Sequence, residues 1–148
     1  MRRYSPLLGL LVLVLACGSD SPRGYSDAAT ADPLHGKWRV VSVEVDGRRL
    51  PPHWFSGTLL VIRGGQFFWM MDGHTLSCQS YRFDARGQPA RLDRTERDDV
   101  FQTTETWREI CQVEGDRLRI ARGVKPGDRP ASFSDSGIAV MTLERVKE

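Results

Sequence analysis

No stretch of this 148-residue chain is apolar over the roughly 18 or more residues that a membrane-spanning helix needs. The longest apolar run, residues 7–16, is about half as long as a membrane span and follows two arginines, Arg2 and Arg3. A short basic start before such a run is typical of a secretory signal peptide. Residues 1–16 are therefore predicted to be a signal peptide.

The predicted signal ends in VLAC, with the small Ala16 directly before Cys17. This resembles the lipobox of bacterial lipoproteins, in which the cysteine becomes the lipidated first residue of the mature protein, although Leu15 stands where a small residue is more usual. The resemblance implies lipidation at Cys17 and a membrane-anchored lipoprotein of the bacterial cell envelope, facing the periplasm or the exterior. Two alternatives stay open: an ordinary signal cleaved nearby, and an uncleaved anchor.

Net charge is also small, because 21 lysines and arginines face 19 acids. Removal of residues 1–16 takes away two arginines and no acid, which leaves 19 charges of each sign. A neutral chain lacks the basic surface of a nucleic-acid binder, so no nucleic-acid partner is expected. Residues 17–33 are mostly small or polar and lack apolar periodicity, so they are predicted to be the lipidated cysteine and a flexible tether.

Helical periodicity is missing from the rest of the chain. From Leu34 onward, Gly, Asp or Pro recurs about every eight to twelve residues, between segments rich in β-branched and aromatic residues, which is typical of an all-β sandwich or barrel. A meander of eight such strands can close into a barrel, which removes exposed strand edges, so the pattern alone leaves both sandwich and barrel open. The expected strands are 37–45, 58–63, 66–71, 77–84, 90–94, 103–114, 117–122 and 138–146.

Six sequence blocks in order also carry a family resemblance: LHGKWRVVSVEVDGRRLP, LLVIRGGQF, YRFDARGQPARLD, VEGDRLRIAR, GDRPASF and VMTLERVK. Together they resemble the lipocalin-like domain abundant in planctomycete bacteria, from about Leu34 to Lys147. The resemblance implies that residues 34–148 form an eight-stranded antiparallel up-and-down barrel. The family is known mainly as a domain whose biochemical role is largely undefined. This chain departs from the pattern through a pair of cysteines and the charged insert RTERDDVFQTTETW.

The resemblance implies a role for the Gly-x-Trp on the first strand. In lipocalin-like barrels this Trp lies across one end of the barrel, and a basic residue near the last strand often packs over it. Trp38 and Arg145 are the expected pair, joined by a cation–π contact. The first and last strands must then be neighbours. The alternative is an ordinary core Trp without a special partner.

Cys78 and Cys111 are the only cysteines besides Cys17. An even pair in an exported chain predicts a disulfide, which would close a loop of about 33 residues and stabilise the fold by roughly 3–4 kcal/mol. Strand alternation places Cys111 on an inward face and Cys78 on an outward face, so the bond requires a bulge or turn at Cys78.

Apolar residues on neighbouring strands predict the wall of an interior pocket for a small hydrophobic ligand. The candidates are Phe67, Trp69, Met71, Tyr81, Phe83 and Trp107. The same residues are equally compatible with a core filled by side chains. Two functions follow: a binding module with an apolar ligand in its barrel, or a structural or interaction module with a solid barrel.

Signals for catalysis and for metal binding are lacking. There is no Gly-x-Ser-x-Gly motif and no phosphate-binding loop. His35, His53 and His74 are scattered and are expected to be surface imidazoles rather than metal ligands. The mixed charges of DRTERDD suggest a solvated hairpin edge. No catalytic residue, metal site or cofactor is predicted, and the protein is not expected to be an enzyme.

Overall fold

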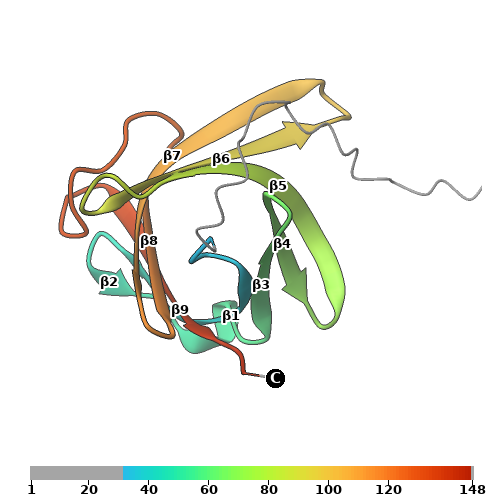
Figure 1. The fold of residues 1–148 in the computed structure, drawn as a ribbon, viewed down its shortest axis with the longest axis horizontal. Coiled ribbons are helices and arrows are strands. Elements are labelled where there is room, and N and C mark those ends of the chain that lie inside the picture. Colours follow the sequence, from blue (N-terminus) through green and yellow to red (C-terminus); the bar gives the residue numbers. More distant parts are fainter. Residues whose placement is uncertain (1–31, 148) are drawn as a thin grey trace, which may run out of the picture.

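Eight antiparallel strands close into an up-and-down barrel in the computed structural model, which describes residues 32–147 (Figure 1). The predicted fold class is therefore confirmed, whereas the predicted signal peptide, Cys17 and nearly all of the tether lie outside the described residues. The barrel strands are β1 (Gly36–Val45), β3 (Thr58–Arg63), β4 (Gln66–Met71), β5 (His74–Asp84), β6 (Ala90–Asp98), β7 (Thr103–Glu114), β8 (Arg117–Gly123) and β9 (Ile138–Arg145).

Two short elements lie outside the barrel wall. The two-residue strand β2 (Arg48–Arg49) pairs with the end of β1, and the 3-10 helix η1 (Pro52–Trp54) leads into β3. In residues 32–147 no helix is long and apolar enough to cross a membrane.

The barrel closes between its first and last strands. β1 runs antiparallel to β9, from the pair Trp38 and Arg145 to the pair Val45 and Ala139, with a bulge between Val40 and Ser42. Short turns join β3 to β8 in order, whereas longer segments connect β1 with β3 and β8 with β9. The β3–β4 turn uses Gly64 and Gly65, both with positive φ, as a two-residue hairpin requires.

Side chains alternate between the inside and the outside of the barrel along each strand, and the inward apolar ones form a filled layer. Seven inward side chains of this layer, from six strands, are completely buried: Trp38, Leu60, Ile62, Phe67, Leu92, Leu118 and Leu143. Large apolar side chains that lose all contact with water each contribute roughly 1.5–3 kcal/mol to folding, so this layer is the main source of stability.

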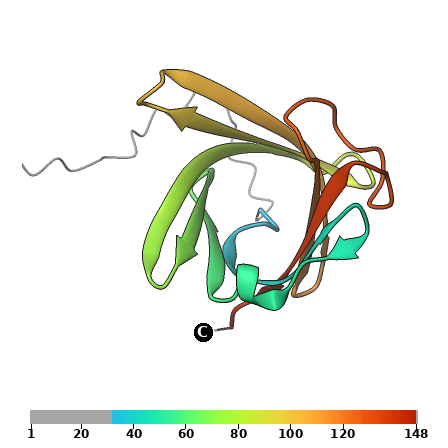
Figure 2. The ribbon, with the colours of Figure 1, turned by 180° about the vertical axis from the view of Figure 1, so that it is seen from behind.

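A second, smaller apolar cluster lies on the outside of the wall. It consists of Ile110, Ala121, Ile138 and Val140, with Phe133 of the β8–β9 loop packed against it. The loop is held in place by Arg129, which donates hydrogen bonds to the backbone carbonyls of Leu92 and Glu109 and to Asp93, 2.6 Å away. Figure 2 shows this loop folded on the outside of the barrel.

The ends of β6 and β7 leave the barrel wall as a two-stranded ribbon. β6 pairs with β5 only as far as Thr95, and β7 pairs with β8 only from Glu109 onward. Residues 96–98 therefore pair only with residues 103–105, and residues 106–108 pair only with residues 93–95 of β6. In Figure 1 the ribbon projects beyond the ring of strands.

Candidate functional site

A buried ion pair lies on the inner face of the neighbouring strands β6 and β7, beside the apolar layer. Arg94 of β6 donates two hydrogen bonds to Glu109 of β7, from Nε to Oε2 at 2.6 Å and from Nη2 to Oε1 at 2.5 Å. Arg94 is 4 % exposed and Glu109 is fully buried. Register explains the contact, because Glu109 pairs with Leu92, two residues before Arg94 on the same face.

Gln79 and Trp69 extend this pair into a network. Arg94 Nη1 donates to Oε1 of Gln79 at 2.6 Å, and Trp69 Nε1 donates to the same oxygen at 3.2 Å. Gln79 Nε2 in turn donates to Glu96 at 3.1 Å. Among the residues that the structure describes, no buried side-chain nitrogen or oxygen lacks a hydrogen-bond partner. This network is therefore a satisfied part of the core.

The prediction of a solvated edge for DRTERDD is wrong for its middle residues. Arg94 is buried, and Glu96 faces the interior, where it accepts the hydrogen bond from Gln79. β6 is four residues longer than expected and continues to Asp98. Alternation was the available signal: if Leu92 faces the core, so do Arg94 and Glu96.

Arg122 of β8 also turns towards the interior and stacks on Trp107. Its Cζ atom lies 4.2 Å from the centroid of the Trp107 ring. Burial lowers the pKa of Arg122, and the neighbouring positive charge of Arg94 adds to this effect. Trp107, predicted to line the ligand pocket, therefore packs against the guanidinium of Arg122 instead.

The other predicted wall residues take different places. Phe67 is completely buried and lies 4.8 Å from Tyr81, measured between ring centroids. The Tyr81 hydroxyl donates to Asp32, and burial, with help from that carboxylate, raises the pKa of Tyr81. Met71 is half-buried at the end of β4. The predicted wall is therefore divided between the filled core and the polar network.

One end of the barrel is closed by residues 32–35. The indole nitrogen of Trp38 donates to the carbonyl of Leu34 at 2.8 Å, and Leu34 is completely buried. Arg145 covers the ring from outside, with its Cζ atom 4.0 Å from the ring centroid. Arg145 also donates to the carbonyls of His35 and Pro33, at 2.7 and 3.1 Å. The contact implied by the resemblance is present.

This arrangement explains the glycine of the Gly-x-Trp motif. Gly36 has a φ of 134°, in a region that L residues rarely adopt. A Cβ atom at this position would lie 2.6 Å from Nη1 of Arg145. Only glycine lets the guanidinium lie across the start of β1 and reach the carbonyls beneath.

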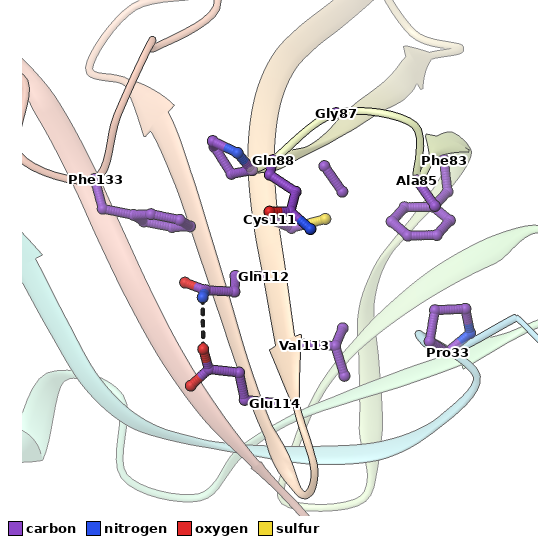
Figure 3. Close-up of a pocket in the computed structure, with 12 residues that line it drawn as sticks. Pro33, Phe83, Ala85, Gly87, Gln88, Cys111, Gln112, Val113, Glu114 and Phe133 are labelled. Atoms are coloured by element: carbon purple, nitrogen blue, oxygen red, sulfur yellow. Dashed lines mark hydrogen bonds between the residues drawn. The ribbon is translucent and has the colours of Figure 1, made fainter.

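A pocket of about 650 Å³ opens beside this closed end. It lies between the β5–β6 turn, the last residues of β7 and Phe133 of the outer loop, as Figure 3 shows. Its lining is mainly apolar, with amide and carboxylate groups among it: Pro33, Phe83, Ala85, Gly87, Gln88, Pro89, Ala90, Cys111, Gln112, Val113, Glu114 and Phe133. Of the predicted wall residues, only Phe83 lines it.

The predicted disulfide between Cys78 and Cys111 is not formed, and Cys111 carries a free thiol. The two residues lie on β5 and β7, which are separated by β6. Cys111 pairs with Ala90 on the inward face, whereas Cys78 pairs with Phe68 and alternates with the buried Gln79, which places it on the outward face. The bulge in β5 precedes Cys78 and does not turn it inward.

The thiol of Cys111 is also unreactive. Burial, followed in importance by the charge of Glu109, raises the pKa of its thiol to about 12. A thiol with such a pKa is protonated at neutral pH and is a poor nucleophile. Cys111 contributes an apolar surface to the pocket.

Metal-binding groups do not gather anywhere in residues 32–147, where no cluster of three or more His, Cys, Asp or Glu side chains could hold an ion. His35, His53 and His74 are all exposed.

Comparison of the chain with known protein families, with curated proteins and with solved structures finds no match.

Proposed function

We propose that the protein is a small-molecule binding module of the cell envelope, with its ligand in the pocket beside the closed end of the barrel. The observation that carries the proposal is the pocket itself. Its volume of about 650 Å³ lies within the roughly 300–1,000 Å³ of typical ligand sites, and its lining is mostly apolar with a few polar groups.

The lining points to an amphipathic ligand. Phe83, Val113 and Phe133 offer apolar surface to its body, and burial of that body gains about 25 cal/mol per Å². Gln112 donates to Glu114 at 2.6 Å, so this carboxylate is held near the pocket as an acceptor. A ligand with an apolar body and one hydrogen-bond donor fits this chemistry. Binding is passive in this proposal: burial keeps the thiol of Cys111 in the lining protonated, and the described residues form no metal-binding cluster.

The pocket can be tested by obstruction. We expect Ala90→Trp to weaken binding of the neutral dye N-phenylnaphthylamine about tenfold or more, which corresponds to at least about 1.4 kcal/mol, because the new ring occupies the pocket. Gln88→Trp should also weaken dye binding, and because Gln88 lies in the exposed β5–β6 turn, this change does not disturb a strand. Ala131→Trp, exposed and outside the lining, should bind as the wild type does.

Native mass spectrometry of the protein purified from cell envelopes supplies the second measurement. A bound small molecule that is lost in both pocket variants supports the proposal. Protein that is free of ligand, with dye binding equal in all variants, supports instead the alternative of a structural or interaction module. The filled apolar layer and the satisfied Arg94–Glu109 network favour that alternative for the centre of the barrel.

We also propose that the module is a lipoprotein anchored through Cys17 and related to the lipocalin-like domains that its sequence blocks resemble. The barrel and the Trp38–Arg145 contact support the relationship, and the VLAC sequence supports the anchor.

Anchoring gives a direct prediction. The mature wild-type protein should partition into the detergent phase of a Triton X-114 separation, and Cys17→Ser should shift it to the aqueous phase or leave the signal uncleaved. Cys78→Ser, on the barrel wall, is the matched control and should not change the partition. A wild-type protein in the aqueous phase, with its mature start at another residue, would contradict lipidation.

A further inference from the structure

Large apolar side chains are exposed at the end of the barrel opposite Trp38. Trp54, Leu76 and Val124 are each more than half exposed, and Val100 and Phe101 are 84 % and 76 % exposed. Connections in an up-and-down barrel alternate between its two ends, so the β1–β3, β4–β5, β6–β7 and β8–β9 connections share one end. Trp54, Val100, Phe101 and Val124 lie in three of these connections, and Leu76 lies near the start of β5. We call these five residues the apolar rim.

The ribbon tip in this rim is held in a defined conformation. Oδ1 of Asp98 accepts hydrogen bonds from the backbone N–H groups of Val100 and Phe101, at 2.9 and 3.1 Å. Asp99 forms an ion pair with Arg97 at 2.8 Å. The two apolar side chains are thus presented outward by an ordered turn, and both nearby carboxylates are already engaged, which lowers the cost of bringing the tip close to an apolar phase.

We propose that the apolar rim contacts the surface of a phospholipid bilayer. The rim consists of separate points on different connections, and a fluid membrane can fit itself around separate points. A protein partner would need a continuous complementary patch of about 800 Å². Trp and Phe are also suited to the boundary between headgroups and acyl chains. The inference does not depend on the proposed ligand.

The length of chain before the barrel agrees with this orientation. If Cys17 carries the lipid, 14 residues lie between the anchor and Asp32 at the closed end. A chain of this length can reach at most about 50 Å when fully extended. The ten residues of β1, at about 3.3 Å per residue and a tilt of about 40°, give the barrel a height of about 25 Å. The chain before the barrel is therefore long enough for the lipid and the apolar rim to contact the same bilayer.

The test measures depth at single positions, so that it separates rim contact from anchoring. The mature protein is reconstituted into phosphatidylcholine vesicles with lipids brominated in the acyl chain near the headgroup, which quench tryptophan only at contact. The signal of Trp54 is the difference between wild type and Trp54→Phe. The second reporter is the double variant Trp54→Phe with Phe101→Trp. Its signal is the difference in fluorescence between this double variant and Trp54→Phe alone. We expect brominated lipid to reduce both signals by at least about a third.

The control places the same reporter on the barrel wall. Val41 is a partly exposed apolar residue in the middle of β1, away from both ends. The fluorescence of the tryptophan in Val41→Trp should be the same in vesicles with and without brominated lipid. The proposal is overturned if neither rim position is quenched, if only one is, or if position 41 is quenched equally. It is also overturned if a co-purified protein shields the rim from the lipid. Detergent partition of the same samples reports anchoring independently.

Discussion

Replacement of Arg94 by methionine should lower the free energy of unfolding by about 3–5 kcal/mol, because it leaves the carboxylate of Glu109 buried without its counter-charge. Gln79 loses the donor at 2.6 Å at the same time. Urea unfolding followed by tryptophan fluorescence measures the change. The double variant Arg94→Met with Glu109→Leu removes both charges and should lose much less than the single variant, since apolar residues of similar size can replace a buried ion pair.

The exposed ion pair between Arg86 and Asp84 supplies the control. It has a similar distance, 2.8 Å, but its arginine side chain is 90 % exposed. Arg86→Met should leave stability unchanged within error, since solvent screens such pairs. If Arg94→Met were as mild as Arg86→Met, or if the double variant were less stable than the single one, the interior network would not contribute as its geometry indicates.

This network marks the limit of what composition and pattern can predict. Seven of the eight expected strands lie within about three residues of their observed positions, because Gly-rich turns and alternation define them locally. The sequence pattern predicts that β6 ends at Arg94, but the strand continues to Asp98 and the side chain of Arg94 is buried. Its partner Glu109 lies on another strand, and only the register of β6 and β7 brings the two charges together.

The pocket could not be located from the sequence for a related reason. Its lining joins the β5–β6 turn, the end of β7, Pro33 before the first strand, and Phe133 in the last long loop. These segments are brought together by barrel closure and by the attachment of the loop through Arg129. The disulfide prediction failed because counting cysteines ignores which strands are neighbours, and β6 separates β5 from β7.

The closed end was expected only through the resemblance to lipocalin-like domains, which implies the contact between Trp38 and Arg145 that the structure contains. The Gly-x-Trp spacing supplies the ring and the glycine that makes room for the guanidinium, and Arg145 is reached through the pairing of β1 with β9. That pairing joins the two ends of the described barrel, about a hundred residues apart in sequence. The stability of this contact therefore tests the closure of the whole fold.

Trp38→Ala should lower the free energy of unfolding by about 3–5 kcal/mol, as expected for truncation of a large, completely buried aromatic side chain. The variant also loses the hydrogen bond from the indole to the carbonyl of Leu34, which holds residues 32–35 against the barrel. Arg145→Ala should cost less, about 0.5–2 kcal/mol, because the guanidinium lies outside the ring and mainly contributes a cation–π contact. Both changes are measured by denaturant unfolding.

Arg145→Lys separates the two contributions of the arginine. Lysine keeps the positive charge over Trp38, but its N–H groups share one nitrogen, so it cannot reproduce the donation from two separate nitrogens to the carbonyls of His35 and Pro33. A stability between those of wild type and Arg145→Ala is expected. If Arg145→Ala instead destabilised the protein as much as Trp38→Ala, the closed end would depend on the hydrogen bonds of the arginine to residues 33 and 35. The packing of the Trp38 ring would then be secondary, and the barrel would be held closed from outside rather than from its core.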